Sequence, residues 1–409
     1  MSELSQAFDL SSPEFVANPY PTYERLLADA PIYWCEEREF YYVSHQPYVK
    51  ALFLDPRASS DRVKPMVANL NDMQRQAVEP LTSTLSKWML FQDPPEHTPI
   101  RKLVNQALSA KVISTMQADI QSIVDELIDD IVNADECDLI ADFAYPLPAI
   151  VIALILGVPV EDRDKIKAWS TTIAQFLGAK TDLSMVAKAQ QDILAAKAYF
   201  ATLLQQERSS PRDNVMSQML ALQGRQPSFT DEHLIANCIL LIFAGHETTT
   251  NLIGNAWLTL LQHPEQLAAL RADPRLVDAA IEECLRYESP VQRMGRLVKE
   301  PITLGDEILL PGKRVLLLMG AANRDGAFVD DPNRFNIHRS ASRHLAFGHG
   351  IHLCSGAALA RLETKLALLS LCQRLERSEL LDSQPQWTYN LGMRAMERCP
   401  LKNSGSTGP

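Results

Sequence analysis

A long apolar segment near the middle of the chain constrains the fold most. Residues 228–264 read SFTDEHLIANCILLIFAGHETTTNLIGNAWLTLLQHP. Thr230 is a suitable helix N-cap, two acidic residues follow it in the first turn, and Pro264 ends the pattern. Between these signals the residues are apolar on nearly every side, as in a helix that runs through a protein core. The sequence therefore predicts a fold built around one long buried helix.

Polar residues interrupt this helix at AGHETTT, residues 244–250, which we call the polar notch. Gly245 weakens a helix by about 1 kcal/mol relative to alanine, and a buried Glu247 requires a partner. The threonine hydroxyls could simply bond back to the preceding turn, or the segment could form a polar bulge at the surface. Because apolar residues flank it on both sides, we favour a notch that faces a cavity and handles protons.

A second segment, FGHGIHLCSG at 347–356, places Cys354 just before a strongly helical run. We call it the cysteine loop. A thiolate is favoured at a helix N-terminus, and the glycines would let the backbone approach something flat and bulky. The loop matches no cysteine-protease spacing that we can justify, and zinc would need more Cys or His at ligand spacing. A single axial thiolate to a haem iron needs only one cysteine.

Two weaker patterns complete the set. Glu283 and Arg286 are three residues apart on one predicted helix face, which in isolation indicates an ordinary surface ion pair. His97 and Arg101 lie four apart at a predicted helix start after DPPE, where a cationic face would suit an anion. A solvated face is the default interpretation of that pattern alone.

Composition limits the alternatives. The 409 residues contain 46% hydrophobic residues, and length alone favours two or three domains. The net charge of -11 argues against nucleic acid as a main partner. Seven dispersed cysteines without a CxxC pair indicate a reducing, cytoplasmic location, and no signal peptide is evident. Prolines interrupt the apolar segment 143–160, so we expect a core helix there and no membrane anchor.

The arrangement of patterns along the chain predicts a mainly α protein with some β structure. PIYWCEEREFYYVS resembles a hairpin, helical spacing dominates from about residue 98, and residues 302–325 look strand-like around a Pro-Gly turn. We expect the tail 403–409 to be disordered.

Together the segments resemble the cytochrome P450 superfamily, which uses a thiolate to ligate haem iron. FGHGIHLCSGAALAR (347–361) matches the family pattern F-G-x-G-x-H-x-C-x-G-x-x-L-A-R at every fixed position, and AGHETT, ECLR and DPNRF match three further family motifs in order. The resemblance implies one mainly helical domain over residues 1–402, a triangular prism with small β-sheets, in place of the two or three suggested by length. It also implies haem b as the cofactor.

The resemblance assigns roles to individual residues. Cys354 becomes the axial iron ligand, and Glu247 with Thr248 becomes the acid–alcohol pair that delivers protons during O2 activation. The positions that match haem-binding residues are His97, Arg101, Arg296 and His352 for the propionates, with Phe347, Gly348, Ala244 and Gly245 beside the ring. Arg293 is an alternative to Arg296. Gly245 is expected to leave room for oxygen and porphyrin. Glu283, Arg286 and Arg334 are expected to form a buried proximal network.

The resemblance also implies a monooxygenase that acts on a medium-sized lipophilic substrate. The pocket is expected to contain Trp88, Met89, Leu240, Phe243, Val291, Met294 and Met393. Arg293 and Arg394 could bind a polar end of the substrate or point to solvent. No fused reductase is evident, so electrons are expected from a ferredoxin or flavodoxin with its reductase. Lys102, Arg343 and Lys365 are a possible docking patch, and scattered solvated charges are an equal alternative.

Two other functions share the haem-thiolate reading. A peroxide-driven peroxygenase ranks lower because such relatives tend to lack the acid–alcohol pair. A non-catalytic haem sensor would need no proton relay, so the intact AGHETT segment weighs against it.

Overall fold

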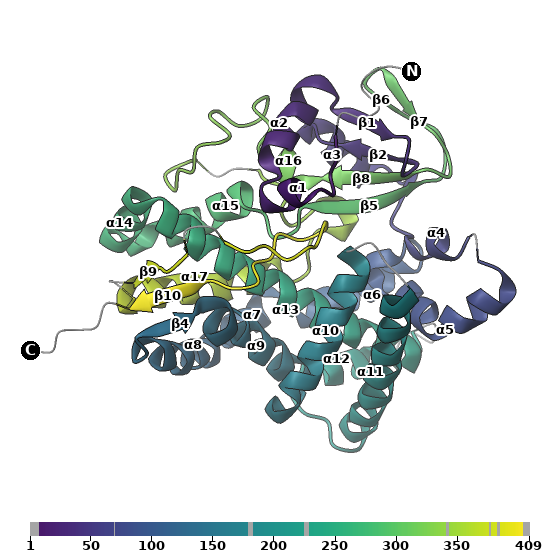
Figure 1. Ribbon diagram of the computed structural model, residues 1–409. Helices are drawn as coiled ribbons and strands as arrows, with labels where there is room; N and C mark the ends of the chain where they lie inside the picture. Colours follow the sequence, from purple (N-terminus) through teal and green to yellow (C-terminus); the bar gives the residue numbers. More distant parts are fainter. Residues whose placement is uncertain are drawn as a thin grey trace, which may run out of the picture.

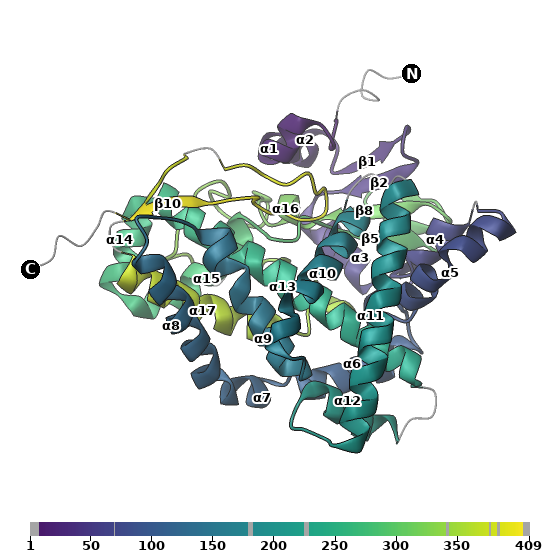
Figure 2. The same ribbon diagram turned by 60° about the horizontal axis from the view of Figure 1, so that its bottom comes forward.

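A single helix, α13 (Asp231–Gln262), forms the centre of the protein. The computed structural model describes residues 8–68, 70–178, 183–224, 229–340, 343–375, 378–382 and 385–403. Of the 32 residues of α13, 23 are buried, so it is enclosed on nearly all sides, as predicted. Thr230 is its N-cap, and its backbone N–H donates to Nδ1 of His233 at 3.4 Å. Both views of the molecule show α13 crossing the middle (Figures 1 and 2).

The other helices pack around α13 or cover the main sheet. In chain order they are α1 (Pro13–Ala17), α2 (Tyr20–Asp29), α3 (Gln46–Leu54), α4 (Val63–Val67), α5 (Asp72–Ser86), α6 (His97–Ala107), α7 (Ala110–Thr115), α8 (Gln117–Val132), α9 (Pro146–Leu156), α10 (Arg163–Gly178), α11 (Leu183–Ser209), α12 (Val215–Gln223), α14 (Pro264–Ala272), α15 (Val277–Tyr287), α16 (Met319–Ala322) and α17 (Ala357–Arg374). Helices α9, α10, α11, α15 and α17 all contact α13.

The strands of the described residues form three small sheets. The largest has the order β1-β2-β8-β5-β3, a three-stranded sheet has the order β4-β10-β9, and β6 pairs with β7. The strands are β1 (Ile32–Cys35), β2 (Phe40–Val43), β3 (Ala58–Ser59), β4 (Glu136–Asp138), β5 (Arg293–Val298), β6 (Ile302–Leu304), β7 (Glu307–Leu309), β8 (Arg314–Leu318), β9 (Ser378–Leu380) and β10 (Pro400–Asn403). In Figure 1 the five-stranded sheet lies at the top with α1, α2 and α3, while α10, α11 and α12 lie below.

The sequence patterns of the β regions are partly confirmed. β1 and β2 form the expected antiparallel hairpin, with Ile32 opposite Val43. The run 302–325 contains three strands, but Pro311 and Gly312 do not close a hairpin, because β7 pairs with β6 while β8 joins β2 and β5 in the main sheet. Its last part, Met319–Ala322, is helical.

The apolar segment 143–160 forms a core helix, as expected. By length and composition Leu139–Leu156 could cross a bilayer, yet 61% of it is buried inside the protein. A π-helical turn, Leu139–Ala144, precedes α9, which begins at Pro146 and ends at Gly157 with φ of 70°. Its contacts with α13 and α8 account for its apolar surface.

The expected boundary of the disordered tail is off by one residue. Asn403 is the last residue of β10, and its side chain donates to the carbonyl oxygens of Ile131 and Ala134. These contacts order Asn403, because they satisfy its amide donors at the end of α8. The rest of the expected tail, 404–409, lies outside the described residues.

Candidate active site

The cysteine loop is closed by backbone geometry that favours glycine. The N–H of Cys354 donates to the carbonyl of Phe347 at 2.9 Å. Gly348 and Gly350 both have φ of 72°, a region that other residues rarely occupy. A Cβ atom on Gly350 would lie 2.9 Å from the carbonyl oxygen of Phe53 in α3. The loop therefore runs against α3 and delivers Cys354 to the start of α17, whose N-cap is Gly356.

The electrostatic surroundings of Cys354 are mixed. The residue is exposed to solvent, yet protein atoms surround its sulfur closely enough that desolvation raises the pKa of the thiol. A hydrogen bond from the backbone of Gly356 and the charges of Arg101 and Arg361 act in the opposite direction. The loop can thus stabilise a thiolate, although the protein alone leaves the thiol protonated at neutral pH.

Arg361, to which the sequence assigned no chemistry, fixes the far side of the loop. Its guanidinium lies 4.5 Å from the ring centroid of Phe347 and donates to Glu282 at 2.6 and 2.9 Å. His344 lies 3.1 Å from the same carboxylate. Burial alone would raise the pKa of Glu282, but the hydrogen bonds from His344 and Arg361 bring it down to about 2. Phe347 is thereby held between α15, α17 and the loop, beside Cys354.

The four predicted propionate-binding residues lie close together. The rings of His97 and His352 are 4.3 Å apart, and Arg101 donates to the carbonyl of Leu353, next to Cys354. Burial, with the charges of Arg296 and His97, lowers the pKa of His352 to about 3. Burial lowers the pKa of Arg296 to about 10.

Arg62 joins this group, which we call the cationic cluster: Arg62, His97, Arg101, Arg296 and His352. Burial, followed by the charge of Arg296, lowers the pKa of Arg62 to about 9. Sequence reasoning missed Arg62 because a lone arginine in SSDRVKP carries no motif. Only the fold brings the start of α4 to β5, where Cδ of Arg62 would be 2.9 Å from a Cβ on Gly295.

The cationic cluster fits the two carboxylates of haem. Within the described part of the chain, Nε2 of His97, Nε2 of His352 and Nε of Arg62 are buried without a hydrogen-bond partner. Asp93 is the acidic residue that offsets charge on Arg296, His97 and His352. Buried cations and unpaired donors of this kind require an anion. His352 belongs to both the cysteine loop and the cationic cluster, and Arg101 of the cluster donates to Leu353 of the loop, so a thiolate ligand and carboxylate donors meet at one place.

The polar notch of α13 faces α10 and α9. The Thr171 hydroxyl of α10 donates to Oε1 of Glu247 at 3.4 Å. Burial raises the pKa of Glu247, while the Thr171 hydrogen bond and Lys167 moderate the effect. His246 is buried 3.2 Å from Ser170 Oγ, and burial with Lys167 lowers its pKa to about 3. Glu247 therefore keeps its proton to higher pH than an exposed carboxyl does, whereas His246 is neutral.

The threonine hydroxyls of the notch also bond back along the helix. Thr248 donates to the carbonyl of Ala244 at 2.8 Å, and Thr249 donates to that of Gly245 at 3.1 Å. The structure thus contains the back-bonded arrangement that was one alternative for this segment. A hydroxyl bonded in this way still has lone pairs free to accept a hydrogen bond.

Gly245 has a packing role that the sequence did not reveal. A Cβ at this position would lie 3.0 Å from Cδ1 of Ile152 in α9. A side chain at this position would thus meet a second helix, and glycine allows α9 and α13 to cross closely. The proposed contact of Gly245 with oxygen and porphyrin stays a prediction.

The proximal ion-pair network is present with one different member. Arg286 donates to both oxygens of Glu283 at 2.8 Å, and both side chains are almost fully buried. The third member of the network is Arg339, whose Nε lies 3.3 Å from the Glu283 carboxylate. The expectation for Arg334 was wrong: its residue is exposed and it contributes its carbonyl oxygen to Arg286 and Arg339. The turn after Asp331 points the Arg334 side chain to solvent.

The expected substrate-pocket residues form two groups. Trp88 stacks on Phe243 at 5.7 Å, and Met89 and Leu240 are buried in the same core. Val291 forms a β-bridge with Met393, whose sulfur lies 4.0 Å from Nδ2 of Asn251 in α13. Met294 lies in β5 opposite Leu317 and, like Val291, packs on the core of the main sheet. The two groups are thus Val291 and Met294 on that core, and Trp88, Met89, Leu240, Phe243 and Met393 on the core around α13.

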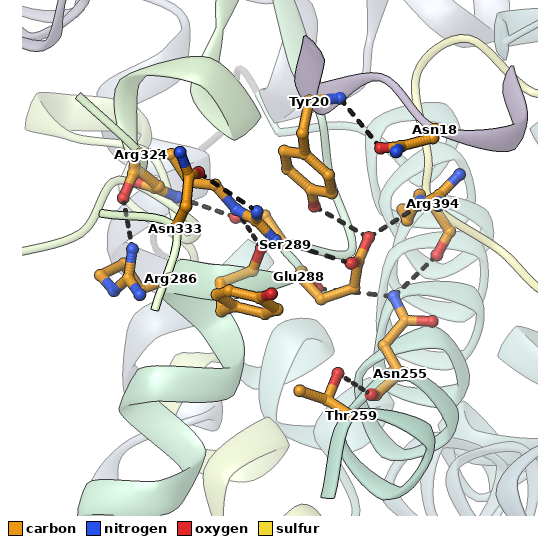
Figure 3. A network of polar contacts seen from close by, with 12 residues as sticks. Asn18, Tyr20, Asn255, Thr259, Arg286, Glu288, Ser289, Arg324, Asn333 and Arg394 are labelled. Carbon is orange, nitrogen blue, oxygen red and sulfur yellow. Dashed lines mark hydrogen bonds and ion pairs between the residues drawn. The ribbon is translucent and has the colours of Figure 1, made fainter. Parts of the chain in front are cut away.

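Arg394 is not available to a substrate, because it belongs to a buried network. It donates to Glu288 at 2.8 Å and to the carbonyls of Val16 and Ala17, while Tyr20 donates to the same oxygen of Glu288. Figure 3 shows Glu288 between Tyr20 and Arg394. This network ties the C-terminal loop to α1 and α15 and so positions Met393. Arg293 is also half-buried, beside the tyrosine hydroxyls of Tyr23 and Tyr42.

The suggested docking patch is partly neutralised. Lys365 lies 2.9 Å from Asp278, whereas Lys102 and Arg343 are exposed.

Comparisons with known proteins agree on one family. The family profile described as Cytochrome P450 matches residues 29–396. The chain is 37% identical to the biotin biosynthesis cytochrome P450 of Bacillus subtilis (strain 168), covering 97% of this chain and 98% of that protein. It is 36% identical to the cytochrome P450 monooxygenase PikC of Streptomyces venezuelae, covering 95% and 92%. The structure of P450BioI, solved with an acyl carrier protein ligated to hexadec-9Z-enoic acid, superposes with a TM-score of 0.90 at 37% identity, covering 96% of this chain and 100% of that one.

Proposed function

Because the chain belongs to the cytochrome P450 family, we propose that its haem-thiolate site hydroxylates or epoxidises a medium-sized lipophilic molecule, with Cys354 as the iron ligand. The protein is a haem-thiolate monooxygenase with haem b as cofactor. A relative that was solved with a long acyl chain makes fatty acyl groups a candidate substrate class for this chain.

Haem b, when bound, supplies an iron centre that activates O2 and transfers one oxygen atom to the substrate. Cys354 would hold the iron, losing its proton on ligation as metal-bound thiols do. The Gly356 N–H and the charges of Arg101 and Arg361 would stabilise the resulting thiolate. His97, Arg101, Arg296 and His352 would bind the two propionates.

Glu247 and Thr248 would move protons to the reacting oxygen. The buried Glu247 carboxyl is the donor, because its raised pKa keeps it protonated closer to neutral pH. Thr171 holds one of its oxygens, and Thr248 would accept a hydrogen bond from a water molecule while it donates to the carbonyl of Ala244. The surrounding apolar residues of α13 and α9 limit other water.

One observation carries the proposal: the cysteine loop and the cationic cluster come together around Arg101 and His352. The test is the spectrum of the reduced protein with carbon monoxide. The wild type should show the red-shifted Soret band of a thiolate ligand, and Cys354→Ser should lose it while keeping its far-UV circular dichroism. A histidine-type band in the wild type would refute the assignment of the ligand.

The proton relay is tested separately. Thr248→Ala should retain haem but divert electrons from NADPH, supplied through a surrogate ferredoxin and reductase, into hydrogen peroxide. Equal ratios of product to NADPH in wild type and variant would count against the relay. We expect a ferredoxin or flavodoxin as the natural donor, and exchange of the two surrogates in the same assay tests this.

A further inference from the structure

Arg62 is a charged residue whose partner is missing from the described part of the chain. It directly precedes α4, and its guanidinium lies 4.2 Å from the ring centroid of Phe91. Its Nε atom is buried without a hydrogen-bond partner, and no ion pair of this residue occurs among the described residues. Arg62 is half-buried as a whole, and its buried Nε lacks the hydrogen bond that normally offsets the burial of a donor.

Aromatic rings connect Arg62 to the polar notch and indicate what kind of partner Arg62 could bind. Phe91 stacks on Trp88 at 5.6 Å, and Trp88 stacks on Phe243 at 5.7 Å. Phe243 directly precedes Ala244, the first residue of the notch. An aromatic wall of three rings therefore runs from the guanidinium of Arg62 to α13. A molecule along this wall would have an apolar body and an anionic end at Arg62.

No acidic side chain of the described residues is found to offset the charge of Arg62. Three arginines of the cationic cluster, Arg62, Arg101 and Arg296, would face the two carboxylates of haem. Asp93 is already satisfied, because Ser59 and the Ser60 N–H donate to it and Lys299 lies 3.5 Å away. Asp93 offsets the charge of Arg296. Arg62, in contrast, feels only the repulsive charge of Arg296.

We propose that Arg62 is a binding residue for a carboxylate group, supplied either by a fatty-acid substrate or by a haem propionate. This inference rests on the proposed haem-thiolate function and extends it to the polar end of the substrate. The substrate source is favoured by the aromatic wall, along which the apolar body of such a molecule would lie. Arginine suits the role because its planar fork binds both oxygens of a carboxylate.

The test compares Arg62→Gln and Arg62→Lys with a control, Lys64→Gln, in the haem-loaded full chain. Lys64 is an exposed cation in α4, so its loss changes the net charge equally outside the cluster. Two measurements are made on each protein. The first is the haem spin-state titration with dodecanoic acid and with 1-dodecanol, which share a chain but differ in charge. The second is the rate of haem transfer to excess apomyoglobin.

Each source predicts its own result. If Arg62 binds a substrate carboxylate, Arg62→Gln lowers the affinity for dodecanoic acid by about tenfold or more and leaves the affinity for 1-dodecanol unchanged. Arg62→Lys recovers part of the lost affinity. With a propionate, Arg62→Gln accelerates haem transfer by about tenfold or more and leaves the acid-to-alcohol affinity ratio unchanged. Lys64→Gln should match the wild type in both measurements.

Unchanged acid affinity together with unchanged haem transfer in both Arg62 variants would overturn the inference. If the wild type does not respond to dodecanoic acid, the substrate source is refuted and haem transfer decides alone. If Arg62→Gln does not load haem, the same measurements on Arg62→Lys decide, since it keeps the charge but loses the planar fork. A wild type without the thiolate-type carbon monoxide band refutes the proposed function itself, which is a different result from a normal band with insensitive Arg62 variants.

Discussion

The ion-pair network behind the haem site offers a sharp test of which arginine completes it. Arg339 donates four hydrogen bonds, one to Glu283 and three to the carbonyl oxygens of Asp330, Asp331 and Arg334. Its side chain is 15% exposed. Arg334, five residues earlier, is exposed and uses its carbonyl oxygen in the network. Arg339→Ala and Arg334→Ala are therefore a matched pair of variants.

The expected difference follows from what each substitution leaves behind. Arg339→Ala weakens the pairing of a buried carboxylate, which keeps Arg286 and the Asn336 N–H. It also removes one donor from each of three carbonyls, of which those of Asp331 and Arg334 keep another. We expect a loss of about 2–3 kcal/mol in the free energy of unfolding. Arg334→Ala should cost less than about 0.5 kcal/mol, because an exposed side chain without partners contributes little.

Urea unfolding measured by far-UV circular dichroism separates the two variants. Proteins are compared at one concentration and with equal haem content, since haem binding stabilises the folded state by mass action. Similar midpoints for the two variants, or a larger shift for Arg334→Ala, would refute the assignment of Arg339.

The remaining predictions concern the loop and the notch. Gly350→Ala should lower haem content and reduce the free energy of unfolding by about 1–3 kcal/mol, because the backbone is strained there and the new Cβ meets the carbonyl of Phe53. Gly356→Ala should have a much smaller effect, because Gly356 has φ of -88° and its new Cβ would meet only the Cys354 sulfur, 4.0 Å away. Equal haem content in the two variants would contradict this prediction. The ratio of product to NADPH should fall as pH rises through the raised pKa of Glu247, because the carboxylate no longer donates a proton; Glu247→Gln should abolish that dependence, and a retained alkaline limb would exclude Glu247 as its source. The pKa of His246, about 3 in the folded protein, lies below its unfolded value of about 6.5, so unfolding takes up a proton between these values. Stability should fall by up to about 1.4 kcal/mol per pH unit as pH drops below about 6.5, and urea midpoints of His246→Gln should lack this contribution.

Much of the local structure could be predicted because its cause is local. The N-cap at Thr230 and the stop before Pro264 bound α13 as expected, since caps and proline act on adjacent backbone groups. The spacing of Glu283 and Arg286 placed them on one face of α15, where they bond directly. The hairpin of β1 and β2 could also be predicted, because its two strands are neighbours in the sequence.

Pairing between distant segments could not be predicted in this way. Arg334 and Arg339 are equally basic in the sequence, and only the turn after Asp331 decides which one reaches Glu283. From the sequence Arg394 could bind a substrate or point to solvent, yet the fold surrounds it with Glu288 and the carbonyls of Val16 and Ala17 in α1. Figure 3 shows Tyr20, from near the start of the chain, and Arg394, from near its end, on either side of Glu288.

The sequence by itself determined the family, the helix that crosses the core and the cysteine that precedes α17, because glycine, proline and helical periodicity act through neighbouring residues. Only the tertiary structure placed Arg62 beside Arg296, set Gly245 against Ile152 and enclosed Glu247 so that its pKa rises. Those properties depend on desolvation and on charges from other elements, and no spacing within one segment encodes them.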